Sequence, residues 1–190
     1  IYTFGRGPTA TTVTIQDDVV TNGESILIKG MVTDESEGTK DSDRLARFPN
    51  GVPAISDENQ SAWMEYVYMQ QPRPTNILGV QVTLSVIDAN NNYRTIGTTT
   101  TNEDGFFKFK WLPDIEGEYT IYASFSGSES YWPSRAVTSF AVDPAPATPT
   151  PVATYAPSTA DLYFMPMSIA IIIAIIVVGM AMVLMMRKKP

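Results

Sequence analysis

The stretch DIEGEYTIYASF, residues 114–125, decides the fold that this sequence predicts. It places Tyr119 two residues after Gly117, at the entrance to a strand. In Greek-key β-sandwiches a tyrosine at this position folds over the corner between two strands and hydrogen-bonds the backbone upstream. An ordinary strand tyrosine is the alternative. We therefore expect Tyr119 to mark the corner of a sandwich.

Six further segments show the apolar alternation and the bounding turns that are typical of short strands. They are residues 11–15, 24–34, 79–88, 93–101, 106–111 and 136–142. The asparagines at 90–92 form a turn signal between two of them, because Asn tolerates positive φ. Together the segments predict a mainly β fold, an immunoglobulin-like Greek-key β-sandwich over residues 9–142. Residues 1–8 are expected to be a lead-in that continues from an upstream region.

Residues 34–79 depart from the strand pattern and predict a loop and short-helix insertion. The polar stretch 34–51 suggests a long surface loop. The stretch 56–72 predicts a helix that Asp57 caps, with Gln60 reaching back to it. Aromatic and Met side chains are enriched at binding surfaces, so we expect partner contact here and in the loop before the last strand. Packing as extra core is the alternative. The candidate partner-binding residues are Trp63, Met64, Tyr66, Tyr68, Tyr131 and Trp132.

The composition removes most enzyme chemistry. Cysteine and histidine are absent, which excludes thiolate sites and the commonest general base. No phosphate loop, dinucleotide fingerprint or nucleophile elbow is present. We expect no catalytic residues, no cofactor and no metal site, and we do not expect an enzyme.

Calcium is the one weak exception. Asp88-x-Asn90-x-Asn92 resembles the start of a calcium loop, but Tyr93 and Thr99 replace the required Gly and Glu. A site could form only if loops at the end of the sandwich bring carboxylates together. The candidates for such a Ca²⁺ site are Asp34, Glu35, Asp88, Glu103 and Asp104.

The acidic balance excludes a nucleic-acid partner. Residues 1–164 hold ten Lys or Arg and twenty Asp or Glu, a balance of 10 − 20 = −10. Binding to phosphates needs clustered cations instead. Asn59-Gln60-Ser61 is a sequon, so Asn59 is a possible glycosylation site if the domain lies outside the cell.

Residues 143–164 predict a Pro/Thr-rich stalk. Five prolines between Asp143 and Ala160 fix their own φ angles and favour extended polyproline II geometry. Such a segment builds no core. Its threonines and serines fit an O-glycosylated spacer.

Residues 165–186 predict a single transmembrane helix. They contain no charged residue, and 22 helical residues span about 33 Å, close to the hydrocarbon core of about 30 Å. Pro166 is expected in the first helical turn, where its missing N–H has no cost. The expected anchor residues are Met165, Ile171, Ile175, Gly179 and Leu184, with Arg187, Lys188 and Lys189 of the basic tail 187–190.

The charges beside this segment predict its orientation. Three cations follow it directly, whereas residues 136–166 contain no Lys or Arg. The positive-inside rule places the C-terminus in the cytoplasm and the N-terminal domain outside the cell. The lipid bilayer is then the first expected partner. A tail-anchored protein with a cytosolic domain is the alternative.

Two resemblances add to this interpretation. VQVTLSVIDANNN, TTTTNEDGFFKF and LPDIEGEYTIYASFSG, within residues 78–142, resemble the carboxypeptidase-regulatory-like and Cna-B-like repeats of prokaryotic surface proteins. That resemblance implies a non-catalytic sandwich that acts as a stalk, spacer or adhesive module.

FGRGPTATTVTI, SDENQSAWMEYVYMQQPRPTN and GSESYWPS, with the stalk and basic tail, are similar to the C-terminal regions of archaeal surface proteins. Several of those proteins carry pyrroloquinoline-quinone-type β-propeller repeats upstream. This sequence contains no propeller repeat, so the resemblance implies anchoring alone. The tail also resembles archaeal sorting signals that are cut and lipid-linked, with Phe164-Met165-Pro166 where those have Pro-Gly-Phe or Pro-Glu-Phe.

Taken together, these patterns predict a membrane-anchored extracellular structural or binding module that displays or tethers something at the cell surface. The alternative is the anchoring end, or a small accessory subunit, of a larger envelope complex whose active portion lies elsewhere. Other surface or envelope proteins are possible partners in both cases.

Overall fold

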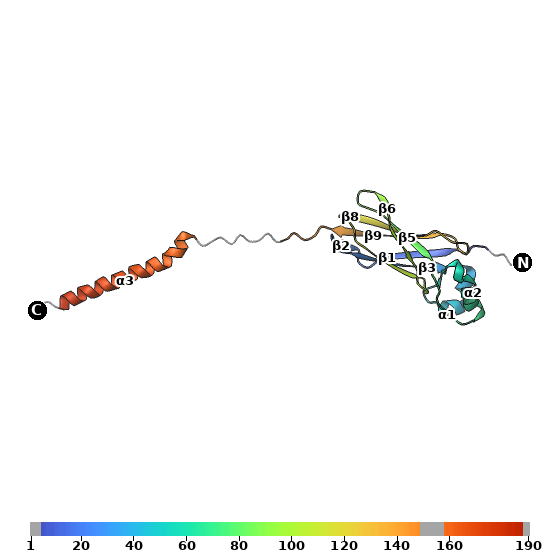
Figure 1. Cartoon of the computed structure of the whole chain (residues 1–190), viewed down its shortest axis with the longest axis horizontal. Coiled ribbons are helices and arrows are strands. Elements are labelled where there is room, and N and C mark those ends of the chain that lie inside the picture. Colours follow the sequence, from blue (N-terminus) through green and yellow to red (C-terminus); the bar gives the residue numbers. More distant parts are fainter. Residues whose placement is uncertain (1–4, 149–157, 188–190) are drawn as a thin grey trace. The chain divides into compact units, whose positions relative to one another are not determined.

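The computed structural model describes residues 5–148 and 158–187, apart from the side chain of Asp161. The chain divides into two units, Ile1–Pro146 and Ala147–Pro190. Figure 1 shows the strands and short helices of the first unit and the long helix of the second. The strands are β1 (Thr9–Ile15), β2 (Val19–Thr21), β3 (Ile26–Asp34), β4 (Val52–Pro53), β5 (Gln81–Ile87), β6 (Tyr93–Thr100), β7 (Phe106–Trp111), β8 (Gly117–Phe125) and β9 (Ser134–Asp143). The helices are η1 (Glu37–Lys40), α1 (Ser42–Arg47), η2 (Asp57–Asn59), α2 (Gln60–Met69) and α3 (Thr159–Arg187).

The nine strands of the described residues form two sheets. One sheet has the order β1-β3-β4, with β7 also paired to β3, and all of its pairs are antiparallel. The other has the order β2-β9-β8-β5-β6, in which only the β2–β9 pair is parallel. The chain leaves the second sheet after β6 and joins the first at β7, then returns at β8. This exchange confirms the predicted immunoglobulin-like Greek-key sandwich.

The core lies between the sheets because each strand turns alternate residues inward. Val82, Leu84 and Val86 on β5 are fully buried, as are Ile28 and Val32 on β3. Each such side chain contributes roughly 1.5–3 kcal/mol through removal from water. The apolar residues whose alternation predicted these strands are therefore the residues that are buried in the core.

Tyr119 forms the predicted corner. Its side chain is fully buried, and its hydroxyl accepts a hydrogen bond from the amide of Ile115 at 3.1 Å. The same hydroxyl lies 3.1 Å from the Ile115 carbonyl and 3.1 Å from Asp114 Oδ1. Gly117 enters β8 with φ +113°, a conformation that side chains rarely adopt. The tyrosine-corner prediction is confirmed.

The corner is closed by an ion pair. The Arg94 guanidinium donates to both carboxylate oxygens of Asp114, from Nη1 to Oδ2 at 2.6 Å and from Nη2 to Oδ1. Hydrogen bonding to Arg94 lowers the pKa of Asp114 to about 2. The ring of Trp111 packs on Tyr119 at a centroid distance of 5.4 Å. Strands β6, β7 and β8 are thus joined at one end of the sandwich.

The second unit corrects one expectation about the apolar segment. α3 begins at Thr159, so residues 159–164 of the predicted stalk are helical and Pro166 lies inside the helix, not in its first turn. A proline there removes one backbone hydrogen bond, and Figure 1 shows α3 bending near its N-terminal end. The rest of the stalk at 149–157 and the tail residues 188–190 lie outside the described residues.

Substitution of the corner tyrosine gives the first prediction. Tyr119→Phe removes the hydroxyl and leaves the amide of Ile115 without its partner. We expect the free energy of unfolding to fall by about 1–2 kcal/mol. Denaturant unfolding of the full chain in detergent micelles, followed by tryptophan fluorescence, measures this change.

Tyr122→Phe is the matched control, because Tyr122 is half-buried on the same strand and its hydroxyl makes no hydrogen bond within the described residues. It should change the free energy by less than about 0.5 kcal/mol. Equal effects of the two substitutions would contradict the corner's role.

Candidate functional site

The insertion between β3 and β5 folds around a small core of its own. Its buried apolar residues are Val52, Ile55, Trp63, Val67 and Ile77. The ring of Trp63 packs against Phe48 and Tyr66 at centroid distances of 5.8 and 5.3 Å. Trp63 is 0% exposed, so α2 buries it one helical turn before Val67. The insertion is therefore a packed substructure and not a free loop.

Asp57 attaches this substructure to the sandwich. Its Oδ1 accepts hydrogen bonds from Ser128 Oγ at 2.8 Å and from the amide of Ser130 at 3.0 Å, and its Oδ2 accepts from the amide of Glu129 at 3.0 Å. Partial burial raises the pKa of Asp57, but these hydrogen bonds outweigh it and the net pKa is lowered. The loop before β9 is thus held by one carboxylate of the insertion.

This arrangement corrects the predicted helix cap. Asp57 opens η2, and no side-chain cap bond is present at the start of α2. Gln60, expected to reach back to Asp57, instead donates from Nε2 to the hydroxyl of Tyr131 at 3.1 Å. Both side chains therefore bond to the loop before β9 and not to the start of α2.

The N-terminal lead-in joins the same region. The amide of Gly7 donates to the Ser130 carbonyl, and the amide of Trp132 donates to the Gly7 carbonyl, both at 2.8 Å. A Cβ at Gly7 would lie 2.6 Å from Ser36 Oγ, so a larger residue here would displace the Ser36 side chain. Lead-in, insertion and β9 loop therefore meet at one end of the sandwich.

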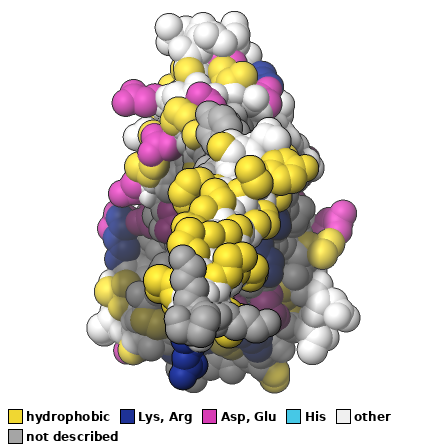
Figure 2. Space-filling view, turned by 90° about the vertical axis from the view of Figure 1, so that its left-hand side faces the viewer, with side chains coloured by type: hydrophobic (Ala, Val, Ile, Leu, Met, Phe, Trp, Pro, Cys, Tyr) yellow, Lys and Arg dark blue, Asp and Glu magenta, His cyan; other side chains and the backbone are white. Residues whose placement is uncertain are grey.

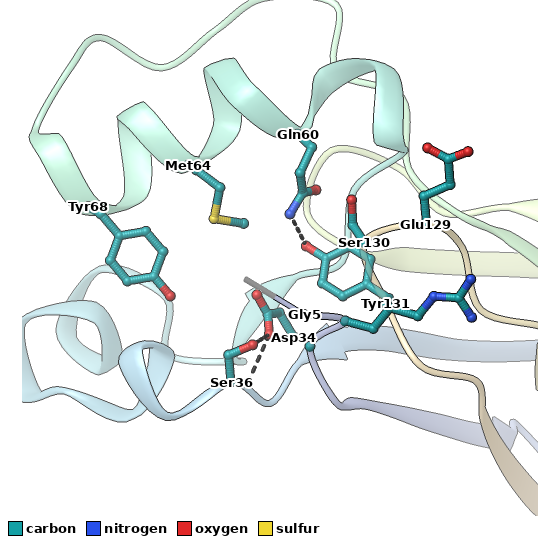
Figure 3. Close-up of a pocket in the computed structure, with 11 residues that line it drawn as sticks. Gly5, Asp34, Ser36, Gln60, Met64, Tyr68, Glu129, Ser130 and Tyr131 are labelled. Carbon is teal, nitrogen blue, oxygen red and sulfur yellow. Dashed lines mark hydrogen bonds between the residues drawn. The ribbon is translucent and has the colours of Figure 1, made fainter. Parts of the chain in front are cut away.

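A cavity of about 730 Å³ lies where these segments meet. Figure 3 shows α2 forming one wall, with Gln60, Met64 and Tyr68 directed into the space. Asp34 at the end of β3 forms the floor together with Ser36. The lining residues are Gly5, Arg6, Gly7, Asp34, Ser36, Gln60, Met64, Tyr68, Glu129, Ser130 and Tyr131.

Asp34 is the unusual group in this cavity. It is 4% exposed, and its Oδ1 accepts from the amide of Ser36 at 2.9 Å and from Ser36 Oγ at 2.5 Å. No described residue donates to its Oδ2, which faces the space between Met64 and Gln60 in Figure 3. Burial raises the pKa of Asp34 despite the two bonds from Ser36. A buried carboxylate that lacks a cation lowers stability, and such groups cluster at functional sites.

The six predicted contact residues fall into different environments. Trp63 and Tyr131, 0% and 1% exposed, are core residues, the alternative that the sequence left open. Met64 and Tyr68 line the cavity. Tyr66 is half-buried, whereas Trp132 is 55% exposed, with Arg6 5.5 Å above its ring. The structure thus brings four of the residues together around α2 and two in the loop before β9.

The proposed calcium ligands do not converge. Asp88 lies at the end of β5, where it accepts the amides of Asn90 and Asn92 at 2.9 Å, and so closes its own hairpin turn. Glu103 and Asp104 lie beyond the opposite end of β5, where both pair with Arg73. Within the described residues, no three acidic side chains are close enough to hold a metal ion.

Asn59, the predicted glycosylation site, is half-buried. Its Oδ1 accepts hydrogen bonds from Ser56 Oγ at 3.1 Å and from the amide of Leu78 at 2.9 Å. These bonds fix the start of η2 to the end of the insertion. Glycan attachment at Asn59 stays a prediction.

No sequence pattern identifies Ser36 and Gln60 as cavity residues, and the pattern around Asp34 suggested only calcium. One local signal was available for Asp34. It is the last residue of β3 and directly follows buried positions of that strand, which indicates that its carboxylate is buried as well. The partners of Gln60 and Asp57 lie 71 to 73 residues away in the sequence, so no local pattern could identify them.

The described fold is an immunoglobulin-like sandwich with a docked helical insertion and a separate apolar helix. No family model and no curated protein matches the sequence. One similar solved structure is a tetra-tandem repeat in the extending region of a large adhesion protein, with a TM-score of 0.40 and 12% identity over 72% of this chain. Another is a CARDB domain from Pyrococcus furiosus in complex with di-metal ions, with a TM-score of 0.36 and 13% identity over 76% of this chain and 100% of that one.

The match spans about a quarter of the adhesion protein's chain, 24%. Similarities this distant carry no conclusion about function. The archaeal and β-propeller context that the sequence resembles stays a prediction.

The electrostatics of Asp34 give the second prediction. Because its pKa is raised in the folded state, the ionised form is disfavoured there, and folding stability rises as pH falls through the folded pKa. Asp34→Asn keeps an oxygen for Ser36 and removes the charge, so it should raise the melting temperature at pH 7, and the difference from wild type should shrink in acid. Thermal melting between pH 4 and 8 measures this. Glu35, Tyr68, Tyr131, Arg6 and Glu129 are the other ionisable groups facing the site, and all are retained in this variant.

Asp88→Asn is the control with the opposite sign. Hydrogen bonding from Asn92 lowers the pKa of Asp88, so its charge stabilises the fold above the unfolded pKa. This substitution should lower the melting temperature at pH 7. If Asp34→Asn lowers the melting temperature at pH 7 as Asp88→Asn does, the electrostatic description of Asp34 is wrong.

Proposed function

We propose that this chain is a non-catalytic module that α3 anchors in the cell membrane and that displays the sandwich and its insertion outside the cell. One observation carries this proposal. Within α3, Leu162–Arg187 is a segment of 26 residues whose most apolar stretch of 18 residues has a mean hydropathy of 3.1, and none of that stretch is buried. At about 1.5 Å per residue it is long enough to cross a hydrocarbon core of about 30 Å. Figure 2, a view from the left-hand side of Figure 1, shows hydrophobic side chains, in yellow, gathered in the foreground among white and grey atoms.

The bilayer is the partner that such a surface fits. An exposed apolar helix of this size in water would associate or aggregate, whereas lipid satisfies every one of its side chains. Arg187 at the end of the helix, Lys188 and Lys189 directly after it, and the absence of Lys and Arg from residues 136–166 favour a cytoplasmic C-terminus. The sandwich, the insertion and the cavity then face the exterior, where other surface or envelope proteins are available as partners.

The absence of Cys and His supports the non-catalytic role, because the common nucleophiles and general bases that depend on them cannot be built. An acidic ectodomain supports a role without nucleic acid. Display and tethering need only a stable fold, a spacer and an anchor.

Charges placed in the centre of α3 test the anchor and give the third prediction. The triple substitution Ile172→Lys, Ile175→Lys and Val178→Lys adds about 2.5–3.5 kcal/mol per residue to the cost of insertion. We expect the triple-lysine chain to leave the membrane fraction on alkaline carbonate extraction, whereas the wild type and the matched triple-leucine chain stay. Release of all three chains would overturn the anchoring role.

Protease added to intact cells tests the orientation separately. An extracellular sandwich should be cut away from the cell while an epitope tag after Pro190 stays protected. Protection of the sandwich with loss of the tag would establish the opposite orientation and leave the anchor itself intact.

A further inference from the structure

We infer that the cavity floored by Asp34 is a binding site for a primary alkylammonium group, of the kind that a lysine side chain or a small free amine carries. The inference goes beyond the anchoring role, because binding can be measured whether or not α3 crosses a bilayer in the cell. Four features of the cavity lead to it.

The first feature is a buried acid without a cation. None of the ion pairs among the described residues involves Asp34. The two nearby arginines are engaged elsewhere, since Arg6 lies over Trp132 and Arg44 pairs with Asp41 at 2.9 Å while it lies over Tyr68. A charge removed from water in this way is stabilised most by a cation that enters the cavity.

The second feature is a second free acceptor. Gln60 Oε1 is buried and has no hydrogen-bond partner, because the amide nitrogen of Gln60 is the end directed to Tyr131. Gln60 Oε1 and the open Oδ2 of Asp34 are thus two acceptors without a donor among the described residues, and the Tyr68 hydroxyl, which can donate or accept, lines the same cavity. An ammonium group carries three donors and no acceptor, which complements this set.

The third feature is the lining between the polar atoms. The ring of Tyr68, the ring of Tyr131 and the thioether of Met64 surround the space in Figure 3. Aromatic faces attract ammonium groups, and Met adapts to alkyl chains. The walls therefore suit the methylene groups behind a charged head.

The fourth feature is size. A volume of about 730 Å³ falls within the range of about 300–1,000 Å³ that ligand pockets usually show. A side chain as long as lysine fits easily, with room for the atoms to which it is attached. A lone inorganic cation would leave most of this space and the apolar lining unused.

The site is held by contacts that do not depend on a ligand. Asp57 fixes the loop that carries Tyr131, and Gly7 packs against Ser36, so both walls are formed in advance. Preformed walls lower the ordering cost of binding. The cavity is therefore ready for an ammonium ligand in the unbound protein.

Titration of the full chain in detergent micelles with n-butylammonium chloride tests the inference. Heat release and amide chemical shifts of residues 34–36 and 60–68 are the two readouts, and n-pentanol serves as a neutral probe of similar length. We expect saturable binding of the ammonium with shifts confined to the cavity, and binding of n-pentanol at least tenfold weaker. No binding of butylammonium, or equal binding of the two probes, would overturn the proposal.

Variants decide whether Asp34 carries the interaction. Asp34→Asn removes the charge but keeps an acceptor for Ser36, and it should weaken butylammonium binding by about 10- to 100-fold, as expected for a lost charge-assisted hydrogen bond. The matched control Asp104→Asn removes an exposed acid that pairs with Arg73 outside the cavity, and binding should be unchanged. Equal weakening in both variants would show a general charge effect and overturn the site.

The source of the ammonium group is distinguished by a second pair of probes. A short peptide with a central lysine and the same peptide with that lysine acetylated are titrated next to free butylammonium. Binding of the lysine peptide and not of its acetylated form assigns the site to a protein side chain, and binding of butylammonium alone assigns it to a small amine. Both results support the ammonium site, whereas tighter binding of the acetylated peptide would contradict it.

Discussion

The carboxylate of Asp57 is the constraint on which the cavity end of the sandwich depends. It accepts hydrogen bonds from the hydroxyl of Ser128 and from the amides of Glu129 and Ser130, and so joins the insertion to the loop before β9. Hydrogen bonds to a charged acceptor are stronger than neutral ones, and here three of them act on one side chain. The insertion has its own core and is joined to the first sheet by the pairing of β4 with β3, and Asp57 adds the contact that joins it to the loop before β9.

The other contacts of this region follow from that attachment. Once the loop is fixed, Tyr131 is buried and Gln60 meets its hydroxyl, while Gly7 completes the wall beside Ser36. The cavity over Asp34 is the space that remains between units with separate cores. The buried carboxylate of Asp34 lowers the stability of the fold, whereas the packing around it raises that stability. A local conflict of this kind in an otherwise consistent fold is characteristic of a functional position.

The sequence predicted the parts of the structure that are governed by local rules. The seven longer strands were predictable because burial on a sandwich imposes a period of two, and Tyr119 was predictable because its partners lie four and five residues away. Strands β2 and β4, of three and two residues, carry too few positions for a pattern. Pro166 was assigned to the first turn because hydropathy marks where apolar residues begin, whereas α3 starts earlier, in polar residues.

The candidate site was harder to predict because its residues come from four separate segments. Asp34, Gln60 and Tyr131 meet only through the docking of the insertion, so no spacing in the sequence relates them. Aromatic content pointed to α2 and to the loop before β9, and residues of both segments line the cavity, but it could not separate core residues from contact residues. Asp57 shows the same limit, because its local position predicts a helix cap whereas its actual partners are more than seventy residues away.

Hydrogen exchange at the amides of Glu129 and Ser130 tests this central claim most directly. In the wild-type chain both amides donate to Asp57, and we expect them to exchange slowly for residues in a surface loop. In Asp57→Ala both should exchange about 10- to 100-fold faster, while the amides around Trp63 in the core of the insertion keep their protection. Equal exchange of the loop amides in the two chains would contradict the account.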